Sequence, residues 1–351
     1  MGATVNLEIE RRKRDHIDAV LNENVTAKGA TTGFESLYFE HVALPEIDLD
    51  NVETGCAIFG KRLAAPLLLS SMTGGTDIAK KINSHLAEAA QEMGIAMGVG
   101  SQRAAIVNPT HENSFRIRSL APDILLFANL GAVQFNYGFT VEQARKAIDM
   151  IEADGLFLHL NPLQEAVQTE GDRNWSGVLN KIGELVESLD TPVVVKEVGN
   201  GISAGIARRL VDLGVSGIDV AGAGGTSWSE VEAYRQTDEQ KRRVAHSFAG
   251  WGIPTAIALS EVRRALPDTP LIASGGIRSG VDVAKAIRLG ADLVGMAAPT
   301  LAPAIETTEV VIGQMAAVAE ELRVAMFCTG SAHLSELRKA TILDNRSALT
   351  L

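Results

Sequence analysis

The chain has 351 residues, of which 46% are hydrophobic and 21% are charged. It can therefore bury a large core, which excludes a disordered chain, a small disulfide-stapled protein and a collagen-like fibre. The 32 Lys and Arg residues against 43 Asp and Glu residues give a net charge of −11, which argues against general binding of nucleic acid or of anionic membranes.

The cysteines and the apolar runs indicate the compartment. Cys56 and Cys328 form no zinc or disulfide-framework spacing, which is typical of a reducing environment. We find no secretory signal pattern in the first thirty residues and no apolar run long enough to span a bilayer. We therefore expect a cytoplasmic protein with no membrane partner and no nucleic-acid partner.

Glycines mark a repeated change from helix to strand. At Gly94, Gly155, Gly214 and Gly290 an apolar helical stretch ends and a short apolar run follows at once. Glycine just past a helix end adopts the left-handed conformation without a Cβ penalty, so each of the four predicts a helix end that leads into a strand. The runs are apolar on both faces, as expected for a parallel sheet covered by helices.

Eight such runs follow one another at a spacing of roughly 30 residues. They are Pro66–Met72, Ile95–Gly100, Ile124–Leu130, Leu156–Asn161, Pro192–Val198, Gly217–Ala221, Pro270–Ser274 and Leu293–Ala297. Helical periodicity lies between them, for example over residues 78–93, over residues 202–213 with Ser203 as a cap, and over about 306–326. This alternation predicts a (β/α)8 barrel; a doubly wound sheet alternates in the same way, but usually with fewer strands.

Two segments lie outside this alternation of strands and helices. Residues 1–62 precede the first strand and contain an apparent helix start at Arg12–Ile17, and a charged segment at about 226–252 separates the sixth and seventh strands. Long insertions of this kind usually form lids or subunit contacts. We expect an N-terminal extension over 1–62 that completes the substrate site, a single barrel over 63–342 and a C-terminal tail over 343–351.

Polar residues follow the predicted strands at the end where a barrel carries its active site. In chain order they are Ser70-Ser71-Met72-Thr73-Gly74-Gly75, Gly100-Ser101-Gln102-Arg103, Asn129, His159-Leu160-Asn161-Pro162-Leu163-Gln164-Glu165, Lys196-Glu197, Gly222-Ala223-Gly224-Gly225-Thr226, Ser274-Gly275-Gly276-Ile277-Arg278 and Ala297-Ala298. Barrels often bind phosphate between the loops after strands seven and eight, so Gly275 and Gly276 favour a phosphate site over a plain tight turn.

Residue type alone leaves more than one role for each of three charged features. Lys196 ends an apolar strand, which favours contact with an anion or a cofactor edge over a Schiff base or a salt bridge, for example to Glu197. Glu165 fits a Mg²⁺ ligand and an ordinary surface residue about equally well. The basic run Arg11–Arg14 at a helix start opposes the helix dipole unless an anion is near, so with Arg103 it could clamp a diphosphate.

One pattern imitates a dinucleotide-binding loop. The glycines of Gly199–Gly205 follow a strand, and Asp219 lies where a ribose-binding acid would. The spacing is GxGxxxG and the position is in the middle of the barrel, so we interpret it as a loop before the fifth helix.

Taken together, the strand-end motifs and Arg12-Lys13-Arg14-Asp15-His16 resemble the type 2 isopentenyl-diphosphate isomerase family over about residues 10–340. The motifs that carry the resemblance include Ser71-Met72-Thr73-Gly74-Gly75, Gly100-Ser101-Gln102-Arg103, His159 to Glu165, Gly224-Gly225-Thr226-Ser227-Trp228 and Ser274 to Arg278. The resemblance implies an FMN protein that needs Mg²⁺ and flavin reduced by NADPH. It would interconvert isopentenyl and dimethylallyl diphosphate, in isoprenoid biosynthesis, as a homotetramer or homo-octamer.

The resemblance also assigns site residues. The implied FMN contacts are Ser70, Ser71, Met72, Thr73, Ser101, Asn129, Lys196, Thr226, Gly275, Gly276, Ile277, Arg278, Ala297 and Ala298. The implied contacts to the diphosphate substrate are Arg12, Lys13, His16, Ser101, Gln102, Arg103, Asn161 and Gln164, and Glu165 would hold Mg²⁺. His159, Gln164 and Lys196 would act in catalysis. Since no side-chain pair forms an obvious acid–base couple, we hypothesise that N5 of the reduced flavin delivers and removes the proton.

Two rival functions follow from the same residues. One is an FMN-dependent oxidoreductase of a 2-hydroxy acid or of a pyrimidine such as dihydroorotate, which would need a proton-abstracting side chain that we do not identify. The other is a non-catalytic flavin- or phosphate-binding barrel that acts as a sensor or assembly part. An IMP-dehydrogenase-like barrel is disfavoured because Gly222–Ser227 contains no nucleophilic cysteine.

Overall fold

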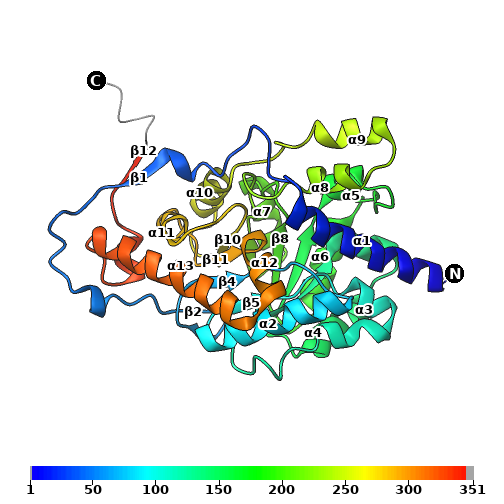
Figure 1. Cartoon of the computed structure of the whole chain (residues 1–351), viewed down its shortest axis with the longest axis horizontal. Helices are drawn as coiled ribbons and strands as arrows, with labels where there is room; N and C mark the ends of the chain where they lie inside the picture. Colours follow the sequence, from blue (N-terminus) through cyan, green and yellow to red (C-terminus); the bar gives the residue numbers. More distant parts are fainter. Residues whose placement is uncertain (1, 345–351) are drawn as a thin grey trace.

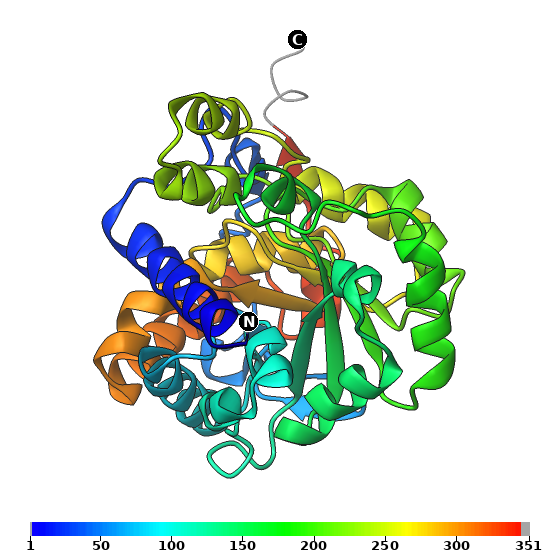
Figure 2. The same cartoon turned by 90° about the vertical axis from the view of Figure 1, so that its right-hand side faces the viewer.

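The computed structural model describes residues 2–344, and eight parallel strands in it close into a barrel (Figures 1 and 2). The barrel strands are β4 Leu67–Leu69, β5 Ala96–Gly98, β6 Leu126–Gly131, β7 Gly155–Leu160, β8 Val193–Glu197, β9 Gly217–Asp219, β10 Leu271–Ala273 and β11 Leu293–Met296. Each lies within one of the eight predicted runs or overlaps it, so the predicted (β/α)8 fold is confirmed.

Helices surround the barrel and connect its strands. The connecting helices include α2 Asp77–Met93, α3 Arg103–Val107, α4 Val141–Ile151, α5 Pro162–Val167, α6 Val178–Ser188, α7 Ala204–Val211, α10 Thr255–Ala265, α11 Gly280–Arg288, α12 Ala298–Glu306 and α13 Thr308–Cys328. Ser203 caps α7 as predicted, since its side chain accepts a hydrogen bond from the Ile206 N–H. The helix predicted over about 306–326 is α13.

Three of the four glycine signals are confirmed and one is wrong. Gly94, Gly214 and Gly290 have positive φ values of 61°, 91° and 113°. Gly155 instead opens strand β7, because α4 ends earlier and Glu152 takes the left-handed cap at φ 50°. Glycine is needed at 155 for packing, since a Cβ there would lie 2.6 Å from the Phe127 ring.

Apolar side chains fill the barrel interior, as in a packed core rather than a pore. Phe127 and Phe157 stack with their ring centroids 4.2 Å apart. The antiparallel hairpin of β2 Cys56–Ile58 and β3 Lys61–Leu63 adds Ile58 and Leu63 to this cluster. The interior is thus closed below the strand ends that carry the polar residues.

The N-terminal extension lies along the barrel rather than apart from it. Helix α1 Gly2–Asn22 lies beside α8 and α12 (Figure 2). The predicted helix start at Arg12–Ile17 is wrong, because these residues lie in the middle of α1, where the dipole argument does not apply. Further along, β1 Leu37–Phe39 pairs antiparallel with β12 Ile342–Asp344. Of the tail predicted over 343–351, residues 345–351 lie outside the described residues.

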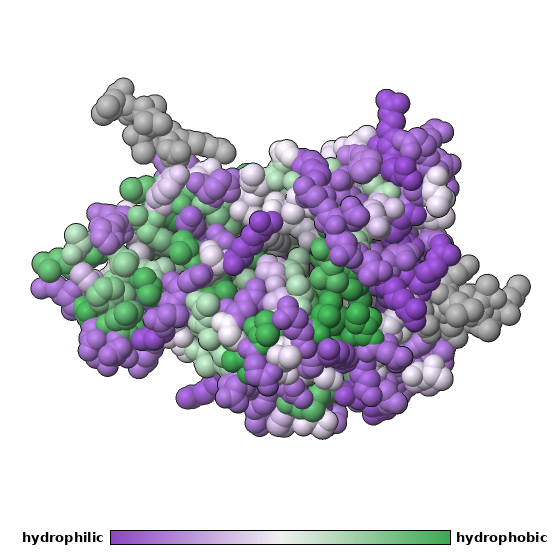
Figure 3. All heavy atoms as spheres, in the orientation of Figure 1, coloured by the Kyte–Doolittle hydropathy of each residue, from purple (hydrophilic) through white to green (hydrophobic). Residues whose placement is uncertain are grey.

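The segment predicted at 226–252 contains two helices. They are α8 Trp228–Arg235 and α9 Glu239–His246. Helix α8 packs against α1 and α5, whereas α9 belongs to a hydrophilic part of the surface at the upper right of Figure 3. No helix in the described part of the chain combines the length and apolar character needed to cross a membrane.

Candidate active site

A cavity of about 800 Å³ opens at the carboxyl ends of the barrel strands. The structure brings all but one of the predicted site residues into its lining. They are Arg12, Lys13, His16, Ser70, Ser71, Met72, Thr73, Ser101, Arg103, Asn129, His159, Asn161, Gln164, Glu165, Lys196, Thr226, Gly275, Gly276, Ile277, Arg278, Ala297 and Ala298. Chain positions from 12 to 298 therefore converge on one hollow.

Gln102 is the exception. Its side chain is fully buried, donates to the Ala147 carbonyl at 2.8 Å and accepts from the Asn129 N–H at 2.9 Å. The residue lies in the wall behind the cavity, where it links the ends of β5 and β6. The structure therefore does not place this side chain where a substrate would touch it, contrary to the prediction.

The side of the cavity formed by β4, β10 and β11 fits a flavin mononucleotide. Gly275 and Gly276 have φ values of 96° and 77°, and a Cβ on Gly275 would lie 2.2 Å from the Gly222 carbonyl oxygen. Helix α12 begins at Ala298, directly after β11, and its first residues Ala298 and Pro299 line the same cavity, so a helix N-terminus lies beside the glycine loop. Just after β4, the buried Ser71 hydroxyl has no hydrogen-bond partner among the described residues, which leaves it able to bind a polar ligand.

Lys196 faces the cavity from the end of β8 and is almost fully buried. Its ammonium donates to the Glu197 carbonyl oxygen at 2.7 Å and lies 3.6 Å from the Asp219 carboxylate. Lys196 therefore has an ion-pair partner, but it is Asp219 and not Glu197, because the Glu197 carboxylate accepts the backbone N–H groups of residues 198–200. These residues form the loop before α7, as we expected for the glycine pattern.

His159 and Asn129 form a neutral pair at the ends of β7 and β6. The His159 Nδ1 lies 2.8 Å from the Asn129 Oδ1, so Nδ1 carries the proton and donates. Burial, followed by the positive charges of Lys196 and Arg103, lowers the pKa of His159 to about 3. A neutral imidazole therefore presents Nε2 as an acceptor at physiological pH.

Glu165 and Gln164 lie on the short helix α5, both buried. Glu165 accepts from the Asn161 amide at 3.1 Å and from the Asp172 N–H at 2.7 Å, and burial raises the pKa of Glu165. Sequence reasoning missed Asp172, which pairs with Arg103 at 2.6 Å. No cluster of three or more His, Cys, Asp or Glu among the described residues could hold a metal, so Mg²⁺ on Glu165 would need oxygens from a substrate.

Helix α1 adds the cationic side of the cavity. Arg12, Lys13 and His16 lie on one face because residues four apart are neighbours on a helix. The Lys13 ammonium donates to the Ser101 carbonyl at 3.2 Å and lies 5.3 Å from the Phe115 ring centroid. Burial and the nearby Arg12 charge lower the pKa of Lys13 to about 7.

Glu232 on α8 is a further buried carboxylate that the sequence did not indicate. It accepts from His16 and Gln164, both at 2.9 Å, and from Arg235 at 2.7 Å. Burial raises its pKa, but the hydrogen bonds and the charges of these partners outweigh that effect and hold it at about 2. The one sequence signal was its position four residues after the Gly224–Trp228 motif.

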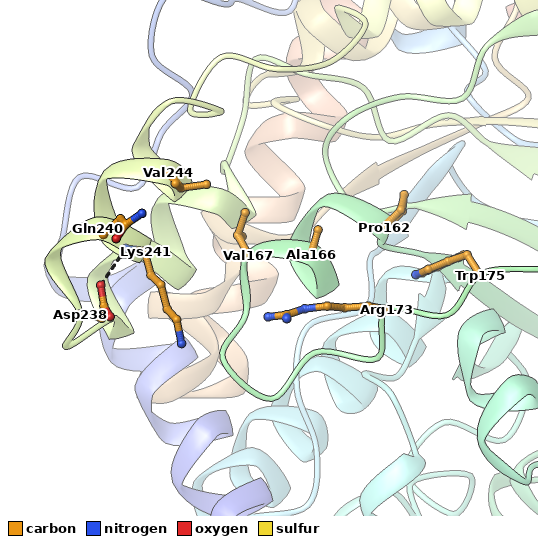
Figure 4. Close-up of a pocket in the computed structure, with 9 residues that line it drawn as sticks. All are labelled: Pro162, Ala166, Val167, Arg173, Trp175, Asp238, Gln240, Lys241 and Val244. Atoms are coloured by element: carbon orange, nitrogen blue, oxygen red, sulfur yellow. Dashed lines mark hydrogen bonds between the residues drawn. The ribbon is translucent and has the colours of Figure 1, made fainter.

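A second hollow lies on the outer face of α5 (Figure 4). Pro162, Ala166 and Val167 line it from α5, with Arg173 on the following loop and Lys241 on α9. None of the predicted site residues line this hollow. The barrel mouth is therefore the candidate active site.

Comparison with known proteins agrees with this geometry. The family model described as FMN-dependent dehydrogenase matches residues 6–115 and 136–344. A Synechocystis sp. isopentenyl-diphosphate delta-isomerase is 58% identical, covering 97% of both chains, and that of Stutzerimonas stutzeri is 57% identical, covering 95% of this chain and 96% of the relative.

This chain belongs to the isopentenyl-diphosphate delta-isomerase family.

The family expected from the strand-end motifs is thereby confirmed. A Rickettsia bellii isopentenyl-diphosphate delta-isomerase is still 49% identical over 97% of this chain and 99% of its own. Among solved structures, a mandelate oxidase mutant with a monooxide FMN adduct superposes with a TM-score of 0.64 at 21% identity, covering 93% of this chain and 95% of that one. At that identity the likeness shows the shared barrel fold.

Proposed function

We propose that this protein interconverts isopentenyl diphosphate and dimethylallyl diphosphate by a 1,3-proton shift, in isoprenoid biosynthesis, with reduced FMN as its cofactor. One observation carries the proposal: a flavin-type cradle on β4, β10 and β11 faces a cationic helix, α1, across a single cavity. The full-length similarity to isopentenyl-diphosphate delta-isomerases supports the same reaction over oxidation of a 2-hydroxy acid or a pyrimidine.

The cofactor residues are those of the predicted set. Gly275, Gly276 and the start of α12 would hold the FMN phosphate, and Ser71 and Lys196 would contact the ring system, with Ser70, Met72, Thr73, Ser101, Asn129, Thr226, Ile277, Arg278, Ala297 and Ala298 around it. When bound and reduced, FMN supplies the acid and the base of the proton shift. Lys196 would place a cation beside the negative charge of the reduced cofactor.

The substrate residues lie opposite the cofactor residues. Arg12, Lys13 and Arg103 would bind the diphosphate, because guanidinium and ammonium groups pair well with phosphate oxygens. His16, Ser101, Asn161, Gln164 and His159 would orient the rest of the substrate. His159 is held neutral by burial and Gln164 is an amide that donates to Glu232, so neither of these two residues is a strong acid or base.

Several finer features belong to the same proposal. Glu165 would bind Mg²⁺ together with substrate oxygens, and NADPH would reduce the flavin. Residues 1–62 would complete the substrate site of the barrel over 63–342, with a tail over 343–351. We further propose a cytoplasmic homotetramer or homo-octamer that binds neither membranes nor nucleic acid.

The experiment that tests this function starts with the purified protein, which should be yellow or should become yellow on adding FMN. Isopentenyl diphosphate is then supplied with and without NADPH and Mg²⁺, and proton exchange and the products are followed. Dimethylallyl diphosphate without stoichiometric NADPH consumption is the expected result. An oxidised product that forms in step with flavin reduction would support the oxidoreductase, and bound FMN without turnover would support the non-catalytic barrel.

A further inference from the structure

Asp219 is a fully buried carboxylate next to Lys196 in the barrel wall. The two residues are register partners on β9 and β8. The Oδ1 of Asp219 accepts from the Ser274 hydroxyl at 2.7 Å and from the Ala221 N–H at 3.2 Å. Its Oδ2 accepts no hydrogen bond from the described residues and lies 3.6 Å from the Lys196 ammonium. This second oxygen thus has the Lys196 charge as its neighbour.

A buried lysine keeps its proton only if a negative charge compensates for the lost hydration. Three titratable groups surround Lys196 on its own and the adjacent strands. His159 on β7 is neutral, and the Glu197 carboxylate is turned toward the backbone N–H groups of residues 198–200. Asp219 on β9 is the carboxylate that faces the ammonium.

We propose that Asp219 is a positioning residue that keeps Lys196 protonated and thereby makes the site prefer the reduced, negatively charged form of its cofactor. The proposal rests on the proposed binding of FMN in this cavity. Asp219 does not line the cavity, so it acts through Lys196 and not by touching the ligand. Burial raises the pKa of Asp219 and the charge of Lys196 limits that rise, so each group favours the charged form of the other.

The test is Asp219→Asn, which keeps the side-chain size and an oxygen that can accept from Ser274 and Ala221 but removes the charge. Affinities for oxidised and reduced FMN are measured by fluorescence and by anaerobic titration from pH 6 to pH 9. At pH 8 we expect the reduced-to-oxidised affinity ratio to fall about tenfold, the effect of losing one charged contact. For a two-electron couple, this tenfold change makes the midpoint potential of the bound FMN about 30 mV more negative.

The pH profile separates this role from a merely structural one. Burial raises the pKa of Asp219, so as the pH falls the wild-type carboxylate takes up a proton and the wild-type affinity ratio should approach that of the variant. Burial raises the pKa of Glu197 to about 7, so Glu197 titrates in both proteins and its contribution cancels in the difference between the two profiles. A deficit of the variant that is larger at pH 6 than at pH 9 would overturn the proposal.

Lys196→Met provides the matched background. Adding Asp219→Asn to Lys196→Met should leave the affinity ratio unchanged, since Asp219 then has no cation to act through. An equal drop in both backgrounds, or a folded Asp219→Asn protein with the wild-type ratio, would overturn the proposal.

Two further outcomes are informative. If Asp219→Asn does not fold, Ser274→Ala is used instead, because it removes the hydroxyl that donates to the carboxylate. The reduced-to-oxidised affinity ratio should then fall by about threefold. This decrease should be absent in the Lys196→Met background. A folded Ser274→Ala protein with the wild-type ratio, or with the same drop in the Lys196→Met background, would overturn the proposal. A wild-type protein that binds no FMN would instead contradict the proposed function.

Discussion

Lys13 is a cation whose surroundings make its charge depend on ligand and pH. It lies in the lining of the cavity with its ammonium on the Ser101 carbonyl and over the Phe115 ring. Because its pKa is lowered to about 7, roughly half of the empty sites carry this charge at neutral pH. A diphosphate next to it favours the charged form, so binding and proton uptake are coupled.

The affinity for isopentenyl diphosphate should therefore fall as the pH rises above about 7, by up to about tenfold per pH unit. The measurement is the substrate KM or Kd between pH 6.5 and pH 9. Lys13→Met should bind weakly at every pH and show a flat profile. Arg14→Gln, the exposed neighbour on the opposite side of α1, is the control and should keep the wild-type slope. A steep slope that persists in Lys13→Met would contradict this role.

A single substitution at Glu165 tests the proposed Mg²⁺ site. Glu165→Gln should keep the hydrogen bonds to Asn161 and Asp172 in part but lose the negative charge that Mg²⁺ requires. We expect the Mg²⁺ concentration for half-maximal turnover to rise by about tenfold or more. Glu170→Gln, which changes an exposed carboxylate on the loop after α5, is the control. An unchanged Mg²⁺ response in Glu165→Gln would remove this residue from the site.

His159 carries a prediction for stability. Its folded-state pKa of about 3 lies below the value of 6.5 in an unfolded chain. The unfolded state therefore takes up the proton first, and stability falls as the pH decreases from about 6.5 toward 3. Relative to His159→Gln, the wild type should lose roughly 1 kcal/mol per pH unit in urea titrations over this range. A constant difference between the two proteins would show that His159 is not held neutral.

At the scale of elements, α1 is held directly against α8 by polar contacts. His16 and Arg235 both donate to Glu232, and Arg235 lies 3.3 Å from the Asp15 carboxylate. Removing one partner of a buried ion pair leaves the others uncompensated. The position of the cationic residues thus depends on a carboxylate that itself belongs to the inserted segment.

Glu232→Gln should accordingly loosen α1. We expect limited trypsin cleavage within Arg11–Arg14 to become about tenfold faster, because proteolysis follows the population of the open form. Glu239→Gln, which removes an exposed ion pair with Arg242 on α9, should leave cleavage unchanged. Equal rates in wild type and Glu232→Gln would show that this contact does not hold the helix.

The elements also show where sequence reasoning succeeded and where it failed. Strand runs and helix periodicity are local, so the eight strands and the end of α2 at Gly94 were predictable. Gly155 was misassigned because its need for glycine comes from the Phe127 ring, on another strand. Glu232, Asp172 and Asp219 were missed as functional partners, because their importance arises from contacts between segments far apart in the chain. The start of α1 was misplaced because the basic run resembles a helix terminus, whereas it lies in the middle of α1.

For the whole molecule, the cofactor should be part of the stability of the fold. Ligand that binds the folded state alone adds about 2.7 kcal/mol at 100 times its Kd, so FMN should raise the thermal midpoint by several degrees. Gly275→Ala should weaken this shift, because a Cβ there would meet the Gly222 carbonyl oxygen at 2.2 Å. Gly205→Ala, where a Cβ meets nothing within 4 Å, is the control. A full FMN shift in Gly275→Ala would contradict the assigned cradle.

The central claim is that the barrel mouth shifts a double bond without net oxidation. The most direct measurement incubates the FMN-loaded, once-reduced protein anaerobically with isopentenyl diphosphate and Mg²⁺ and counts products per flavin. We predict many molecules of dimethylallyl diphosphate per flavin, with the flavin still reduced at the end. No product from a fully loaded protein, or no more than one molecule of product per flavin, would contradict the account.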